Sequence, residues 1–154
     1  MTIDSRQVAA GILEAVPFAR TLGIEFVEVA PEADGGVRVT VRLPDSPAHH
    51  NHIGGPHAGA MFTLAETASG AVALAAFGEL LDRAVPLVTR AEIAYRKRAM
   101  GPVLATARLC RPVAEVVAEL ESGQRPEFPV QVDIVTEEGR PTGEMTVVWT
   151  LRPN

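Results

Sequence analysis

A single carboxylate stands inside a long run of small and apolar residues. All four histidines fall between His49 and His57, and the residues from Ala58 to Gly78 that follow carry only one charge, that of Glu66. A carboxylate in apolar surroundings is a candidate general base that activates water, or a nucleophile that forms a short-lived anhydride. The residue types do not separate these two roles.

The polar segment before this run predicts the other half of a site. Ala58 and Gly59 stand where a helix would begin, and the first turn of a helix has unpaired N–H groups at the positive end of its dipole. Their N–H groups are candidate oxyanion donors for a carbonyl that gains negative charge. Asn51 could hold a water molecule or a carbonyl through its amide, and His57 could orient the loop or bind the substrate.

Helix geometry separates the two halves within one chain. Ala58 and Glu66 are eight residues apart, which is about 12 Å along a helix axis at ~1.5 Å per residue. One carboxylate does not reach a carbonyl docked that far away. Two subunits with antiparallel central helices would bring Glu66 of one protomer to Ala58 of the other. We therefore expect a homodimer, or a homotetramer built from such dimers, with shared sites.

The elements that must position these groups follow an α+β order. Apolar spacing predicts helices at 4–16, 57–78 and 112–122, the last a short insertion. Alternating patterns predict six strands, at 23–29, 37–43, 86–98, 101–110, 128–135 and 144–151. We expect a hairpin turn at 34–36 and a tight turn at 99–102. A sheet curved around one central helix would explain why that helix is small and apolar on every side.

Three buried features are expected of these elements. Gly59 and Gly70 inside the central helix each cost about 1 kcal/mol relative to Ala, so another backbone is expected to approach closely. Cys110 lies in an apolar strand and is expected to be an inert core residue. Trp149 is expected in the core or in an interface.

The stretch from Asn51 to Glu66, "NHIGGPHAGAMFTLAE", resembles the motif of hotdog-fold acyl-CoA thioesterases of the phenylacetate-pathway type. The order of the elements agrees with that family over nearly the whole chain. This resemblance implies a single hotdog domain over residues 1–154, hydrolysis of an acyl- or aryl-CoA thioester, and a dimer with antiparallel central helices. The family prefers Gly where this chain has Ala58, and many members carry Asp in place of Glu66.

The same resemblance implies that basic side chains near strand ends hold the phosphates of coenzyme A. The candidates are Arg90, Arg96, Lys97 and Arg98, and the last three form the only basic cluster of the sequence. No cofactor is expected beyond the coenzyme A of the substrate.

Other functions remain open at this stage. His57 with Glu66 could imitate the pair of a hotdog dehydratase or hydratase, and a non-catalytic hotdog dimer could bind acyl-CoA as a sensor. Glu66 could instead form a structural ion pair with an arginine across the dimer. A zinc site at His50, His52 and His57 is disfavoured because no Cys or ExxH pattern completes it. No GxSxG motif occurs, which argues against a serine hydrolase.

Composition limits the remaining classes. The chain has 154 residues, 47% of them hydrophobic, with a net charge of −5, which suits one domain and argues against a nucleic-acid binder. A single cysteine excludes an intrachain disulfide, and the N-terminus does not resemble a signal peptide, so a cytoplasmic location is expected. Glu66 in the middle of the apolar run and the many Ala, Gly and Thr residues argue against a membrane span.

Overall fold

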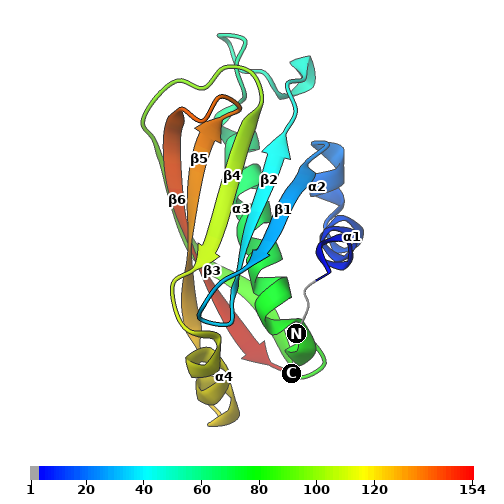
Figure 1. Ribbon diagram of the computed structural model, residues 1–154, viewed down its shortest axis with the longest axis vertical. Coiled ribbons are helices and arrows are strands. Elements are labelled where there is room, and N and C mark those ends of the chain that lie inside the picture. Colours follow the sequence, from blue (N-terminus) through cyan, green and yellow to red (C-terminus); the bar gives the residue numbers. More distant parts are fainter. Residues whose placement is uncertain (1–3) are drawn as a thin grey trace.

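The computed structural model describes residues 4–154, apart from the side chains of Ser5, Arg6 and Ala9, and places one curved sheet around one long helix (Figure 1). Residues 1–3 of the predicted domain lie outside the described residues. The sheet has six antiparallel strands in the order β1-β2-β4-β5-β6-β3. The expected α+β hotdog architecture is therefore confirmed.

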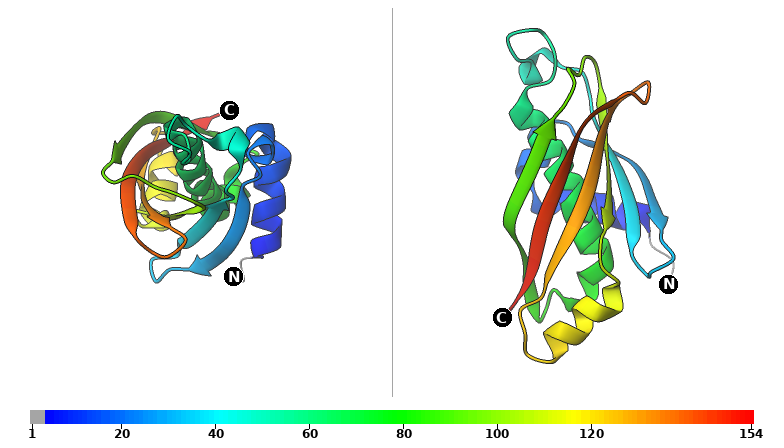
Figure 2. Two further views of the ribbon diagram at one scale, coloured as in Figure 1. Left: turned by 90° about the horizontal axis from the view of Figure 1, so that it is seen from above. Right: turned by 90° about the vertical axis from the view of Figure 1, so that its left-hand side faces the viewer.

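The central helix, α3, runs from Ala58 to Phe77, close to the predicted 57–78. His57 caps its first turn and Gly78 is its C-cap. It carries apolar or small residues all round, which suits a helix that is enclosed by other elements. The helix is long and apolar enough to span a membrane, but here it is the core helix: the sheet curls around it when the molecule is seen from above (Figure 2).

The strands are β1 (Glu25–Pro31), β2 (Val37–Leu43), β3 (Ala84–Tyr95), β4 (Val103–Leu109), β5 (Glu127–Thr136) and β6 (Pro141–Pro153). In β2 every second residue, from Val37 to Leu43, is buried against α3, as the alternating pattern predicted. A hairpin turn joins β1 to β2 at 34–36, where Gly35 has a φ of 84° and Asp34 accepts the N–H of Gly36. The middle strands thus form the inner wall of the core.

The N-terminal segment contains two helices where one was predicted. The helix α1 spans Ser5–Ala15, and α2 follows at Pro17–Thr21 with Pro17 near its start. Proline is well tolerated in a first helical turn, because its missing N–H has no partner there in any case. Pro17 thus separates the two helices and also begins the second. The helix α1 packs against α3 beyond the β1 edge of the sheet.

Strands β3 and β4 follow one another in the chain but are not neighbours. β3 pairs only with β6 and ends at Tyr95, whereas β4 lies between β2 and β5. The prediction of a tight turn at 99–102 between two neighbouring strands is wrong, because residues 96–102 form a longer connection from the edge of the sheet to its middle. The N–H groups of Arg96 and Lys97 both donate to the carbonyl of Thr142, which ends the strand before the predicted residue 98.

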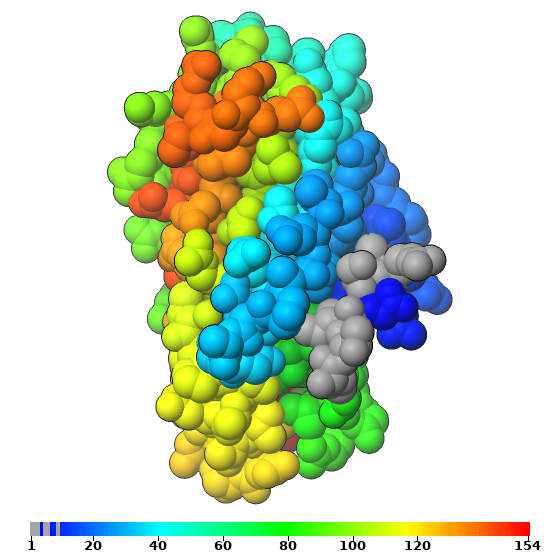
Figure 3. Space-filling view, viewed as in Figure 1, coloured from blue at the N-terminus to red at the C-terminus, as the bar shows by residue number. Residues whose placement is uncertain are grey.

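Beyond the end of β4, the helix α4 (Val113–Glu121) lies where a short helical insertion was predicted. It extends the molecule at its lower end, beside the continuous outer face of the sheet (Figure 3). Cys110 falls in the connection to α4 and is exposed, so the expectation of an inert core cysteine is wrong. Burial alternates along β4 and Leu109 faces the core, so the next position faces outward.

Gly59 and Gly70 of α3 face side chains, and no other backbone segment of the described residues lies against them. A Cβ on Gly70 would meet the indole of Trp149 at 3.5 Å and Ile12 at 3.9 Å, and a Cβ on Gly59 would meet the His57 ring at 3.1 Å. Both neighbours are side chains, so the expected backbone approach is not made by the described residues, and an approach by the backbone of a partner subunit stays a prediction. A close backbone contact lies before the helix, where a Cβ on Gly55 would stand 2.6 Å from the carbonyl oxygen of Ala99.

Candidate functional site

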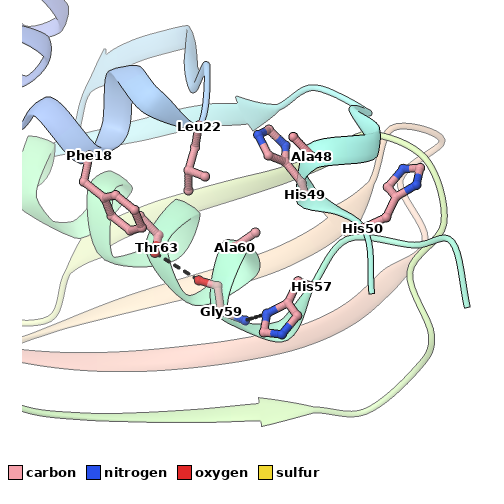
Figure 4. A pocket seen from close by; sticks show the side chains of 9 residues that line it. All are labelled: Phe18, Leu22, Ala48, His49, His50, His57, Gly59, Ala60 and Thr63. Carbon is pink, nitrogen blue, oxygen red and sulfur yellow. Dashed lines mark hydrogen bonds between the residues drawn. The ribbon is translucent and has the colours of Figure 1, made fainter. Parts of the chain in front are cut away.

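The N-terminal tip of α3 is built around the imidazole of His57. Its Nδ1 accepts the N–H of Gly59 at 2.8 Å, and Figure 4 shows the ring lying over the first turn. Because Nδ1 is an acceptor, the neutral ring carries its proton on Nε2. The main-chain N–H of His57 donates to the carbonyl of His49 at 2.7 Å, which ties the helix start to the preceding loop.

This arrangement changes the expected set of oxyanion donors. The N–H of Gly59 is already used by His57, so it is not offered to a substrate in this structure. The N–H of Ala58 has no acceptor among the residues described, and Ala58 is exposed at the helix tip. Of the two candidate donors, Ala58 is the one left free.

Tyr95 is a site residue that the sequence did not indicate. Its hydroxyl, at the end of β3, donates to the carbonyl of Ala58 at 2.8 Å. The Ala58–Gly59 peptide unit is thus held at both ends, by Tyr95 on its carbonyl and by His57 on its N–H. Burial raises the pKa of Tyr95, which favours the protonated form that donates this hydrogen bond.

Replacing Tyr95 with phenylalanine is expected to loosen the tip without unfolding the protein. Loss of one half-exposed hydrogen bond should lower the free energy of unfolding by about 0.5–1 kcal/mol. The kcat of the reaction proposed below should fall several-fold, because a small displacement of a donor weakens its contact with the reacting atom. Urea unfolding and steady-state kinetics measure the two effects.

The matched control is Thr21→Val, which removes an exposed hydroxyl that donates to the carbonyl of Pro17 in α2. It should cost similar stability and leave kcat unchanged. Equal kinetic effects of the two variants would show that Tyr95 acts only on stability.

The loop before α3 uses most of the hydrogen-bonding capacity of Asn51. Its Oδ1 accepts the N–H groups of Ile53 and Gly55, and its Nδ2 donates to the carbonyl of Pro56 at 3.4 Å. An amide nitrogen has two hydrogens, so one donor remains for a water molecule or substrate. In this structure Asn51 shapes the loop, and its predicted contact with a reacting group stays a prediction.

Glu66 is half-buried in the middle of α3. It lines an apolar cavity of about 600 Å³ that α1, β3 and Trp149 also border. Its carboxylate has no hydrogen bond or ion pair with any side chain that the structure describes, so none of the described arginines neutralises it. Desolvation by burial raises the pKa of Glu66 above its ordinary value of 4.5. An unpaired carboxylate beside apolar surface is a basic group, and it can accept a proton from water.

The raised pKa of Glu66 makes a prediction for stability. The folded state holds the Glu66 proton more tightly than the unfolded chain does, so the free energy of unfolding is expected to fall as the pH rises from about 4.5 through the higher pKa of the folded state. The variant Glu66→Gln has no such proton, so its stability relative to wild type should increase across this window.

Urea unfolding at a series of pH values and at one protein concentration measures the difference. Subtracting the two curves removes the contributions of all other carboxylates. A difference that does not change with pH would contradict the desolvated environment of Glu66.

The two halves of the site are apart within the chain. The tip of α3 borders a second cavity, of about 470 Å³, lined by Phe18, Leu22, His49, His57 and Thr63 among others (Figure 4). This cavity and the Glu66 cavity have no lining residue in common. The structure therefore brings Asn51, His57, Ala58 and Gly59 together, and it leaves Glu66 two turns further along α3.

The basic candidates divide into paired and free side chains. Arg96 binds Glu144 through Nε at 3.0 Å, and Arg90 lies 3.9 Å from Glu127 on the exposed face of β3. Lys97 and Arg98 form no ion pair in the part of the chain that the structure describes. They lie between Tyr95 and Ala99, which both touch the α3 tip or its loop. Two uncompensated cations therefore stand beside the tip.

The other histidines do not form a metal cluster with one another among the described residues. His50 pairs with Asp45 at 2.6 Å, and His52 is exposed in the loop. His49 is buried, and its Nδ1 has no partner within residues 4–154. These residues support the loop around the α3 tip.

Comparison with known families and structures places this fold. A sequence profile of the family described as "Domain of unknown function (DUF4442)" matches residues 4–151. A search of curated proteins finds no match. Among solved structures, PA5026 of Pseudomonas aeruginosa, a protein of unknown function described as a probable thioesterase, is 26% identical with a TM-score of 0.83, over 100% of this chain and 99% of that one.

Two further structures have the same fold at lower identity. A variant of the thioesterase PA1618 of P. aeruginosa is 19% identical with a TM-score of 0.77, over 100% of this chain and 97% of that one. The PaaI protein of the phenylacetic acid degradation operon of E. coli is 19% identical with a TM-score of 0.67, over 96% and 97%. The chain thus has the hotdog fold of thioesterase proteins.

Proposed function

Because the chain belongs to the DUF4442 family and has the hotdog fold of thioesterase proteins, we propose that it is an acyl-CoA thioesterase whose sites are shared across a homodimer. The observation that carries this proposal is Glu66. It is an unpaired carboxylate in the wall of an apolar cavity, on the same helix whose tip presents a free N–H group.

In the proposed reaction, the carboxylate of Glu66 takes a proton from a water molecule, and the water oxygen attacks the thioester carbon. The carbonyl oxygen gains negative charge and accepts the N–H of Ala58 at the positive end of α3. The tetrahedral intermediate then expels coenzyme A as a thiolate, which takes up a proton, and the acyl group leaves as a carboxylic acid. Attack by Glu66 itself, through an anhydride, leads to the same products.

A homodimer supplies the geometry that one chain lacks. Glu66 and Ala58 are about 12 Å apart along α3. An antiparallel partner helix would bring Glu66 of one protomer beside Ala58 of the other, and the reverse, so that two sites form. Strand β3 supports this assembly, because it is a 12-residue sheet edge with exposed apolar side chains at Leu87 and Val88. A long exposed edge of this kind is a template for pairing with another strand.

The coenzyme A part of the substrate is proposed to lie beside the α3 tip. Lys97 and Arg98 are the free cations there, and coenzyme A carries several phosphate charges. Arg90 and Arg96 would have to leave Glu127 and Glu144 to contribute. The proposed compartment is the cytoplasm. Acyl-CoA esters are available there, and a chain with a single cysteine needs no oxidising compartment.

The test is a panel of aliphatic and aryl acyl-CoA esters assayed for release of the free thiol, together with the mass of the protein in solution. Turnover of at least one ester by a dimer or tetramer supports the proposal. Binding of acyl-CoA without thiol release would favour a sensor, and hydration of an enoyl-CoA without thiol release would favour a hydratase. A monomer would contradict the shared site.

A further inference from the structure

The cavity beside Glu66 has a shape and a lining of its own. One wall is formed by Glu66, Gly70 and Leu74 of α3, which lie on one face of that helix, and the opposite wall by α1. The remaining lining comes from Leu81, from the start of β3 and from Trp149. Glu66 and Leu74 are eight residues apart, so the cavity follows α3 for about 12 Å.

Apart from the Glu66 carboxylate, the described lining of this cavity offers little to a polar ligand. The hydroxyl of Thr67 donates to the carbonyl of Thr63, and the indole N–H of Trp149 donates to Ser69. The other lining side chains are aliphatic, among them Ile12, Val16, Leu74 and Val85. An elongated chamber with one carboxylate at its end and aliphatic walls fits a flexible hydrocarbon chain better than a single aromatic ring.

We propose that this cavity holds the acyl chain of the substrate, that the substrate is a linear aliphatic thioester of medium length, and that Gly70 sets the accepted length. The inference rests on the function proposed above. The thioester would lie at the Glu66 end, and each further methylene would extend along α3 towards Leu74 and Leu81.

Gly70 is the residue that local structure does not explain. It lies in the interior of α3, where glycine is less favourable than alanine. A Cβ at this position would make only ordinary contacts, 3.5 Å from Trp149 and 3.9 Å from Ile12, so alanine would fit. A glycine there keeps the chamber open one turn beyond Glu66, since a side chain would stand in the path of the hydrocarbon.

The first experiment compares chain-length profiles of wild type, Gly70→Ala and Gly70→Val on CoA esters from acetyl to decanoyl, with benzoyl as the aryl probe. In wild type, kcat/KM should rise about fourfold for each added methylene until the chamber is full, the effect of burying one CH₂. Gly70→Ala should lower the ratio of octanoyl to butanoyl activity, and Gly70→Val should lower it at least tenfold. Gly70→Ala should also raise Tm by about 2–4 °C.

The matched control is Gly78→Ala, at the C-cap of the same helix, where the backbone is still helical with φ −56° and ψ −32°, and outside the cavity lining. A Cβ there would meet only Leu74, at 4.0 Å, so this variant should gain a similar stability and keep the wild-type profile. Overlapping profiles of Gly70→Val and wild type, or a preference for benzoyl over all aliphatic esters, would overturn the inference and leave the thioesterase function standing.

A binding measurement separates this inference from the proposed function. Trp149 is the only tryptophan of the chain and borders the cavity, so its fluorescence should report an occupant. S-alkyl-CoA thioethers of graded length cannot be hydrolysed and should bind more tightly with each methylene in wild type, but not in Gly70→Val. Length-dependent binding in wild type alone, without turnover of any thioester, would refute the proposed thioesterase activity and support the proposed acyl-chain site. Affinities that do not depend on length would refute the cavity, whatever the turnover.

Discussion

Replacement of Glu66 by glutamine is expected to lower kcat for acyl-CoA hydrolysis by 100-fold or more. General-base catalysis typically contributes about 10²–10⁴ to a rate, and an amide accepts no proton from water. Glutamine has nearly the same shape as glutamate, so the cavity and the fold should be retained. Glu66 has no ion pair or hydrogen bond within the described chain whose loss would confuse the result.

Thiol-release kinetics on the best ester of the panel measures this effect, and two variants act as controls. Glu79→Gln changes an exposed carboxylate just beyond the end of α3 and should leave kcat unchanged. Glu66→Asp keeps the carboxylate but draws it back by one methylene, so it should retain more activity than Glu66→Gln. Turnover of Glu66→Gln near the wild-type rate would exclude this residue from the mechanism.

The second large effect is expected from Ala58→Pro, which deletes one N–H group and little else. Ala58 is the first residue of α3, and proline is well tolerated at that position. The preceding residue, His57, has a φ of −62° and a ψ of 143°, an extended conformation that proline favours in its neighbour. The loss of one oxyanion donor costs about 10²–10³ in kcat. Thiol-release kinetics should show this loss, while the Tm stays near that of wild type.

Ala58→Gly serves as the control, because glycine retains the N–H and is the residue that the thioesterase motif prefers. It should keep kcat within a few-fold of wild type. A fully active Ala58→Pro would show that the oxyanion is stabilised by another group.

The same two variants test whether sites are shared between protomers. In a mixed dimer of Glu66→Gln with Ala58→Pro, one site would combine both defects and the other would combine an intact Glu66 with an intact α3 tip. Random exchange in an equal mixture makes half of the dimers mixed, so about a quarter of the wild-type activity should return. No recovery after exchange of subunits would place both groups of a site in one chain.

Local pattern accounts for what the sequence predicted well. The alternation of Val37, Val39 and Val41 with Arg and Thr identifies a strand with one buried face, and the structure buries these valines. The small apolar residues of α3 indicate an enclosed helix, and the start of that helix follows from His57 and the residues after it. Glu66 is conspicuous because it is the only charge in the helix.

Contacts between distant segments account for what the sequence did not show. Tyr95 reaches Ala58, 37 residues away, only because β3 crosses to the far edge of the sheet and ends beside the α3 tip. No local pattern in the sequence reveals that β3 pairs with β6 rather than with β4. The use of the Gly59 N–H by His57 and of the Asn51 amide by its own loop depends on side-chain conformations, which spacing alone does not determine.

The hydrogen bond between Gly59 and His57 also decides the direction in which protons can travel at the helix start. An imidazole that accepts a main-chain hydrogen on one nitrogen and already carries its own hydrogen on the other has no free lone pair in the ring plane. Its Nε2–H can donate a hydrogen bond to a substrate atom, but the ring has no lone pair with which to remove a proton from a substrate carbon. An elimination that begins with such a removal would therefore need a base other than His57 while the Gly59 hydrogen bond is in place.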